Sequence, residues 1–182
     1  LLRPLVDKMD GVAARRAKVE EMHRTAAERV RSQAQAAWDQ SPISHARLYG
    51  ELWPRIKDRP WSLVNSGARL SARTAWEFTE PAQYNAGGGR GGGLGFGLPA
   101  SIGAALAYKG SGRLCIGIVG DGDFLMTNSA LWTAANQRIP VLLIVYNNRS
   151  YYQDFGHQLH MARTRERPEE NVGVGIDVNN PN

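Results

Sequence analysis

The chain has 182 residues, of which 42% are hydrophobic, and it carries a formal net charge of +5. This length is enough for one ordinary domain and an appendage. The basic excess is spread thinly along the chain and forms no long basic run, which argues against nucleic-acid binding. No apolar run reaches the roughly 18 residues that a membrane-spanning helix needs, and the first residues lack a signal-peptide pattern. With one cysteine, Cys115, the chain has no disulfide framework, and we expect a cytoplasmic protein.

The first 42 residues predict a long helix followed by a domain boundary. Val12 to Trp38 contains almost no helix breaker, and its apolar residues form one narrow stripe. The stripe favours a linker helix packed on a neighbouring domain, and the alternative is a coiled-coil or partner-binding helix. We expect residues 1–42 to be the tail of a preceding domain with its linker, and 43–182 to form a second domain. The absence of an initiator Met and the turn residues at 179–182 predict a fragment, truncated at the C-terminus of that second domain.

Residues 43–107 predict three helices, one strand and a glycine-rich loop. The expected elements are a helix from His45 to Lys57 capped by Ser44, a strand from Trp61 to Val64, a helix from Leu70 to Phe78, and a small-residue helix over 98–107. The loop over 87–97 lacks the Gly-Lys-Ser/Thr ending of a P-loop and does not follow an apolar strand, as a dinucleotide fingerprint requires. Either a cofactor lies against this bare backbone, or the loop is flexible and binds nothing.

The stretch from 113 to 150 predicts two parallel strands whose ends carry polar residues. Leu114–Val119 and Val141–Tyr146 are continuous apolar runs, typical of strands buried on both faces, and a helix is expected from Asn128 to Gln137 between them. Asp121 follows the first strand and Asn147-Asn148 follows the second. Although 24 residues lie between Gly122 and Asn147, the carboxyl ends of parallel strands meet at one edge of a sheet.

Carboxylate and amide oxygens that converge at this edge suit Mg²⁺, which completes its coordination with phosphate and water. The glycines beside Asp121 allow a phosphate to approach the backbone N–H groups. This stretch therefore predicts a site for Mg²⁺ and a diphosphate. Beyond it, the aromatic residues after Ser150 are candidates for a substrate pocket, while His157 and His160 are more typical of an exposed helix than of a metal site.

The paired motif resembles that of a known family. Gly120-Asp121-Gly122, followed at this spacing by Asn147-Asn148, is similar to the thiamine-diphosphate-binding motif, and GGLGFGLPASIGAALA at 92–107 resembles the loop and helix before it in acetolactate synthases and benzoylformate decarboxylases. The resemblance covers roughly 43–182. It implies the α/β diphosphate-binding domain, with a parallel sheet and helices on both faces, preceded here by the linker helix.

The resemblance also implies roles for individual residues. Asp121 and Asn148 would bind Mg²⁺ through their side chains and Ser150 through its carbonyl oxygen. Gly122 and Asp123, after Gly120, would meet the diphosphate of thiamine diphosphate through backbone N–H groups. Leu94 would hold the cofactor in its bent shape, and Gly92 would accept a hydrogen bond from its aminopyrimidine. Asn65 to Ala68 falls where the family has a second diphosphate loop.

The implied activity is decarboxylation or carboligation of a 2-keto acid, as in the acetolactate synthases. A benzoylformate-decarboxylase type of enzyme is the first alternative, and a non-catalytic cofactor-binding subunit is another. The family's activating glutamate belongs to a pyrimidine-binding domain that has no match in this sequence, so we expect no catalytic residue here and no turnover by these residues alone. The resemblance further implies a homodimer or homotetramer of the full-length protein, with no nucleic-acid or membrane partner.

Overall fold

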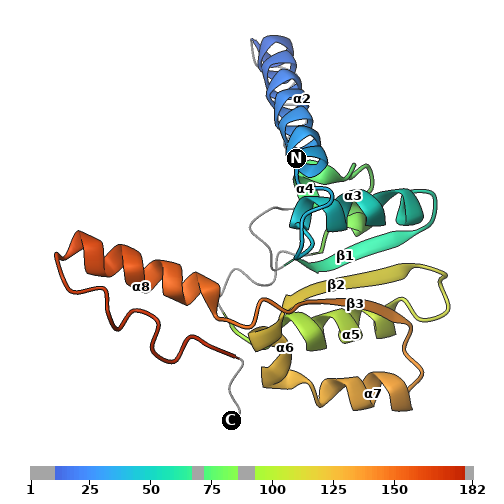
Figure 1. Ribbon diagram of the computed structural model, residues 1–182. Helices are drawn as coiled ribbons and strands as arrows, with labels where there is room; N and C mark the ends of the chain where they lie inside the picture. The colour runs from blue at the N-terminus through green and yellow to red at the C-terminus, as the bar shows by residue number, and fades with distance from the viewer. Residues whose placement is uncertain (1–10, 67–71, 86–92, 179–182) are drawn as a thin grey trace. The chain divides into compact units, whose positions relative to one another are not determined.

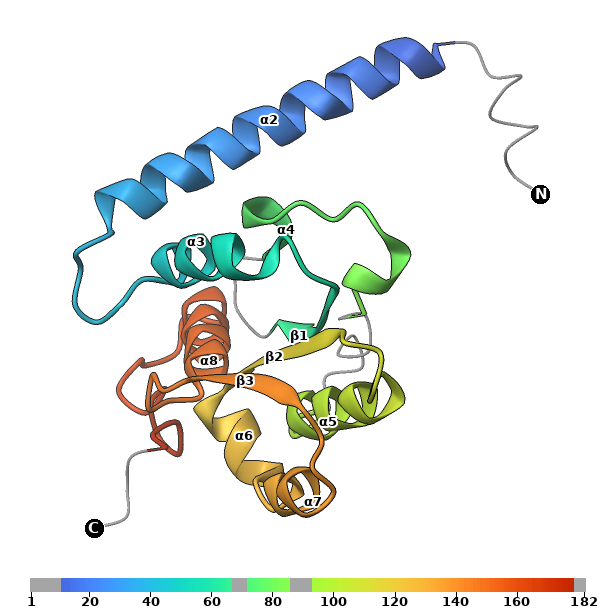
Figure 2. The same ribbon diagram turned by 90° about the vertical axis from the view of Figure 1, so that its right-hand side faces the viewer.

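The computed structural model describes residues 11–66, 72–85 and 93–178. The chain divides into two compact units, one within 1–58 and 70–78 and the other within 59–69 and 79–182. Figures 1 and 2 show the elements of both units in two views. The expected boundary near residue 42 concerns a longer parent protein, and it stays a prediction.

Three helices make up the described part of the first unit: α2 (Val12–Ala36), α3 (His45–Ile56) and α4 (Ala72–Ala75). Ser44 caps α3 as predicted, because its hydroxyl accepts a hydrogen bond from the Arg47 N–H at 3.2 Å. The indole of Trp76 donates to the Tyr49 carbonyl oxygen at 3.0 Å, and its ring meets the Tyr49 ring edge-on. This contact ties the segment after α4 to α3.

The apolar stripe of α2 is only partly covered. Val30 is buried, whereas Val19 and Met22 are each 63% exposed. The predicted long helix is confirmed. Whether the exposed first half of its stripe packs on a neighbouring domain or on a partner helix stays a prediction. Among the residues described, no helix has the length and apolar character that crossing a membrane requires.

The second unit is built on a parallel sheet in the order β1-β2-β3, formed by Trp61–Ser66, Leu114–Gly120 and Val141–Tyr146. The bounds of β2 and β3 agree with the sequence prediction to within one residue. In β1 the pairing register shifts between Leu63 and Asn65, and the strand runs two residues beyond its predicted end. The expected α/β fold with a parallel sheet and flanking helices is confirmed.

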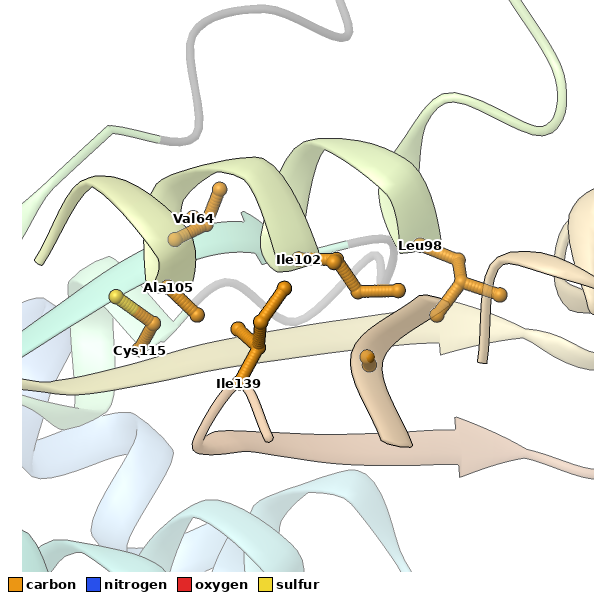
Figure 3. Close-up of a cluster of buried hydrophobic side chains, with 7 residues drawn as sticks. Val64, Leu98, Ile102, Ala105, Cys115 and Ile139 are labelled. Carbon is orange, nitrogen blue, oxygen red and sulfur yellow. The ribbon is translucent and has the colours of Figure 1, made fainter. Parts of the chain in front are cut away.

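Helix α5 (Gly97–Ala107) lies along one face of this sheet, with α6 (Asp121–Thr127) and α7 (Ala130–Asn136) on the same side (Figures 1 and 2). A cluster of buried side chains joins α5 to the strands and to the loop before β3 (Figure 3). Its members are Val64, Leu98, Ile102, Ala105, Cys115, Ala134 and Ile139. Burial of these apolar side chains stabilises the packing of α5 on the sheet.

The helix between β2 and β3 departs from the prediction. One helix was expected over 128–137, but α6 begins at Asp121, immediately after the strand, and α7 follows after Asn128 and Ser129. Asp121 and Asp123 occupy the first turn of α6, where acidic side chains suit the free N–H groups. The flanking glycines had suggested a loop, and this part of the prediction was wrong.

Two further elements are seen in the described part of the unit. The 3₁₀ turn η1 (Pro81–Gln83) follows Glu80, and the Ser62 hydroxyl donates to its Ala82 carbonyl oxygen at 2.5 Å. After β3 comes α8 (Tyr152–Thr164). Arg163 at its end pairs with Glu169 at 2.9 Å, which lowers the pKa of the glutamate through a hydrogen bond. The segment 163–170 is therefore exposed but includes an ion pair.

Cys115 should report on the integrity of this core. The thiol is fully buried in the middle strand, and burial raises its pKa. We expect native protein to react with a disulfide reagent about a thousandfold more slowly than protein unfolded in guanidinium. Because folding favours the neutral thiol, the contribution of Cys115 to stability is complete below the ordinary pKa of the thiol. It falls as the pH rises above that value and is lost once the pH passes the raised pKa. Native labelling as fast as in denaturant would contradict this packing.

Candidate functional site

The ends of β2 and β3 lie level with each other. Gly120, the last residue of β2, pairs with Tyr146, the last residue of β3. Asp121 and Asn147 therefore directly follow the ends of two adjacent parallel strands. The structure brings the two polar segments together at the carboxyl edge of the sheet, as their positions in the sequence predicted.

The Asp121 carboxylate joins these two segments directly. Its Oδ2 atom accepts a hydrogen bond from the Arg149 N–H at 2.5 Å, and its Oδ1 atom accepts one from the Gly122 N–H at 2.9 Å. The residue is only 8% exposed, which makes the carboxylate a fixed group rather than a mobile surface charge. A carboxylate has about four lone-pair sites, so two are left for a cation. The Gly122 N–H, expected to meet a diphosphate, here donates to Asp121, and its predicted role stays untested.

Asn148 lies in an exposed turn beside that contact. Its Oδ1 atom accepts from the Ser150 N–H at 3.3 Å, so the side chain and Ser150 belong to one local turn. Between them Arg149 has a φ of 58°, a left-handed conformation that a non-glycine residue rarely adopts. The hydrogen bond from its N–H to Asp121 helps to hold this backbone. Asn148 and Ser150, two of the predicted magnesium ligands, are thus fixed relative to the third, Asp121.

The segment 176–178, here called the strap, pairs with the same turn through backbone hydrogen bonds. Ser150 pairs with Asp177 in an antiparallel bridge, the Tyr151 N–H donates to the Ile176 carbonyl oxygen at 2.8 Å, and the Val178 N–H donates to the Arg149 carbonyl oxygen at 3.1 Å. The sequence reasoning missed this strap. A local signal was the apolar Ile176, which is buried although it lies between a glycine and an aspartate.

Tyr151 packs against Gly122. The tyrosine hydroxyl donates to the Gly122 carbonyl oxygen at 3.5 Å, and a Cβ atom placed on Gly122 would lie 2.6 Å from Cζ of the ring. Gly122 therefore leaves room for an aromatic ring, a requirement separate from the predicted approach of a phosphate. Tyr151 was predicted only as one of several candidates for a substrate pocket, and its contact with Gly122 was not foreseen.

Residues of β1, the glycine loop and α6 meet beside the acidic turn at 121–123. Asn65 at the end of β1 donates from Nδ2 to the Ile118 carbonyl oxygen at 2.9 Å, and Asp123 accepts at Oδ1 from the Gly95 N–H. Gly97, at the start of α5, lies between them: a Cβ atom there would be 2.6 Å from Asn65 Nδ2 and 2.8 Å from Asp123 Oδ2. The glycine loop, the first strand and α6 thus converge at the predicted cofactor site. Within the proposed second diphosphate loop, 67 and 68 lie outside the described residues.

Leu94 and Gly92 are the two predicted pyrimidine contacts. Leu94 lies at the tip of a turn and is 60% exposed. Gly92 lies outside the described residues. His157 and His160 are exposed on α8, and the described part of the chain contains no group of three or more His, Cys, Asp or Glu suited to a metal ion. The predicted magnesium ligands are a different kind of set, with one carboxylate, one amide and one carbonyl oxygen.

Comparison with known proteins identifies the family. The family model described as "Thiamine pyrophosphate enzyme, C-terminal TPP binding domain" matches residues 67–180, more than half of the chain. The chain belongs to this family. The match includes the acidic turn, the Asn148 turn and their strap, so the fold and the family assignment confirm the predicted resemblance.

Several curated proteins are similar over parts of the chain. Benzoylformate decarboxylase of Pseudomonas aeruginosa is 50% identical over 60 residues, which are 33% of this chain and 11% of that protein. Acetolactate synthase isozyme 1 large subunit of Escherichia coli is 33% identical over 110 residues, 60% of this chain and 19% of that protein. Chloroplastic acetolactate synthase 2 of Brassica napus is 39% identical over 81 residues, 44% of this chain and 12% of that protein. The matched segments thus span about a tenth to a fifth of the length of these relatives.

Proposed function

We propose that this chain is the diphosphate-binding part of an enzyme that uses thiamine diphosphate and Mg²⁺ to decarboxylate or join 2-keto acids, in the manner of an acetolactate synthase. The observation that carries the proposal is the hydrogen bond from the Arg149 N–H to the buried Asp121 carboxylate. This contact sets the carboxylate beside the turn that carries Asn148, and together they offer the hard oxygen ligands that Mg²⁺ prefers.

In this proposal the residues of the chain bind and orient. The side chains of Asp121 and Asn148 and the carbonyl oxygen of Ser150 hold the metal, and the backbone near Gly122 and Asp123 holds the diphosphate. Leu94 and Gly92 orient the aminopyrimidine. The bound cofactor supplies the electron sink for loss of CO₂ from a 2-keto acid. The group that activates the cofactor is expected on another domain, so these residues alone should bind without turnover.

A titration tests the assignment. Thiamine diphosphate is added to the chain in Mg²⁺ or in EDTA while binding is followed by calorimetry, and Asp121→Ala is compared with Asp39→Ala. The Asp39 side chain is 98% exposed, which makes it a suitable control. We expect binding to require Mg²⁺ and to weaken at least about tenfold in Asp121→Ala but not in Asp39→Ala. Circular dichroism verifies that both variants fold. Metal-independent binding, or equal binding by both variants, would refute the proposal.

The relatives leave a second candidate function. A stretch of 60 residues is also similar to a benzoylformate decarboxylase, with a higher identity over a shorter stretch than the match to the Escherichia coli acetolactate synthase. In the full-length protein, pyruvate and benzoylformate separate the two: a synthase forms acetolactate from pyruvate, and a decarboxylase releases benzaldehyde from benzoylformate. A non-catalytic subunit would do neither while still binding the cofactor. We further propose a cytoplasmic homodimer or homotetramer for the full-length protein.

A further inference from the structure

The turn that carries Leu94 has a defined backbone. The Phe96 N–H donates to the Gly93 carbonyl oxygen at 3.4 Å, and Gly95, the third residue of the turn, has a φ of 83°. This is the value that a type II turn requires at that position and that glycine adopts without strain. Leu94 is therefore the second residue of the turn, and its side chain projects from the tip.

Both polar backbone groups of Gly95 bind to side chains of α6. The Gly95 N–H donates to Asp123 Oδ1, and the Gly95 carbonyl oxygen accepts from the Thr127 hydroxyl at 3.0 Å. Asp123 and Thr127 are four residues apart, so they lie on one face of the helix. The fit is close, since a Cβ atom on Gly95 would lie 3.0 Å from Thr127 Cγ2 and 3.3 Å from Met126 Cβ.

The Asp123 carboxylate is partly buried and faces this turn. Its Oδ1 atom holds Gly95, and its Oδ2 atom lies next to Gly97, where a Cβ atom would be 2.8 Å away. A carboxylate turned toward a diphosphate would repel it, whereas one that binds the turn leaves only its backbone N–H for that ligand. The side chain of Asp123 can therefore hold the Leu94 turn at the pyrimidine end of the cofactor, while its backbone N–H binds the diphosphate end.

We propose that Asp123 and Thr127 form a clamp, here called the Gly95 clamp, that fixes the Leu94 turn to the helix that begins at the diphosphate end of the site. The proposal rests on the proposed function for the nature of the ligand. Asp123 and Thr127 are positioning residues, because they act through the Leu94 turn. Because the clamp forms without a ligand, the distance between the Leu94 turn and the diphosphate end of the site is already set in the cofactor-free protein. A ligand that has both a pyrimidine and a diphosphate therefore binds more tightly than a ligand that has the diphosphate alone.

Amide exchange tests whether the clamp exists, without any ligand. We expect the Gly95 N–H of the wild-type chain to exchange slowly, and to exchange at least about tenfold faster in Asp123→Ala, which has no acceptor. Thr127→Val, which keeps the shape but lacks the hydroxyl, should also speed exchange, while Thr127→Ser and Asp123→Asn, which keep a donor and an acceptor, should preserve most of the protection. Unchanged exchange in both Asp123→Ala and Thr127→Val would overturn the clamp.

Two ligands test what the clamp does. Thiamine diphosphate and inorganic pyrophosphate, each with Mg²⁺, are titrated into the same variants. We expect Asp123→Ala and Thr127→Val to weaken thiamine diphosphate by about tenfold while pyrophosphate binds within about twofold of wild type, and Thr127→Ser to restore the difference. Equal losses for the two ligands would overturn the proposal, because the residues would then act on the diphosphate or on folding.

The two proposals fail in distinguishable ways. If wild-type protein binds neither ligand in Mg²⁺, the proposed function fails, and slow exchange at Gly95 shows that the clamp is purely structural. If wild-type protein binds both ligands and the ratio of their affinities is the same in every variant, the proposed function stands and the positioning role fails. Asp39→Ala, distant in sequence and fully exposed, should match wild type in every measurement.

Discussion

Replacing Gly117 by alanine should lower the free energy of unfolding by about 3 kcal/mol, because the substitution overpacks the centre of the sheet. A Cβ atom on Gly117 would overlap the Ser101 hydroxyl, would lie 2.7 Å from Ser101 Cβ and would lie 3.0 Å from Leu143 Cδ2. Ser101 is fully buried and donates to the Gly97 carbonyl oxygen at 2.7 Å, so it cannot turn away without losing that bond. Urea denaturation followed by circular dichroism measures the effect.

Helix α5, which carries Ser101, also contains a glycine that serves as a matched control. A Cβ atom on Gly103, also in α5, would meet nothing within 4 Å, and the residue is exposed. Gly103→Ala should therefore raise stability by about 0.5–1 kcal/mol through the lower entropy of the unfolded chain. Ser101→Gly should recover part of the loss when combined with Gly117→Ala. Equal denaturation midpoints for Gly117→Ala and Gly103→Ala would contradict the close approach of α5 to β2.

The sequence predicted the elements with continuous apolar runs and missed contacts that depend on tertiary structure. β2 and β3 lie where their apolar runs do, because a strand buried on both faces excludes polar residues along its whole length. The small-residue helix predicted over 98–107 is α5, and it packs closely on the sheet. That Gly117 is the point of closest contact did not follow from the sequence, since a glycine within a strand is equally typical of a bulge.

The candidate site shows the same division. The convergence of Asp121 with the Asn148 turn followed from strand order alone, because parallel strands end at one edge. The direction of the Asp123 side chain and the support from 176–178 did not, since each is a contact between residues distant in the chain. Helix α6 was not predicted, because the glycines beside Asp121 are typical of a loop, whereas the backbone is helical from Asp121 onward.

Gly122→Ala should disrupt the Asn148 turn through Tyr151. A Cβ atom on Gly122 would lie 2.6 Å from Cζ of that ring, inside van der Waals contact, so the tyrosine must move. The backbone N–H of Tyr151 donates to the Ile176 carbonyl oxygen, and the N–H of Arg149, two residues earlier, donates to Asp121. Displacement of the tyrosine should therefore weaken both hydrogen bonds. We expect a loss of stability of about 1–3 kcal/mol and at least about tenfold weaker Mg²⁺-dependent binding of thiamine diphosphate.

A second substitution separates the ring from the glycine itself. Tyr151→Ala in the Gly122→Ala background removes the clash, so the double variant should bind the cofactor more tightly than Gly122→Ala alone, measured by the same titration. Gly156→Ala in α8, where a Cβ atom meets nothing within 4 Å, controls for the loss of a glycine. If the double variant binds no better than Gly122→Ala, the glycine is needed for the ligand's approach to the backbone, and the Tyr151 ring has no part in shaping the turn. If binding recovers, the tyrosine after the Asn148 turn and the glycine after Asp121 act as one packing unit, and a change at either position requires a compensating change at the other.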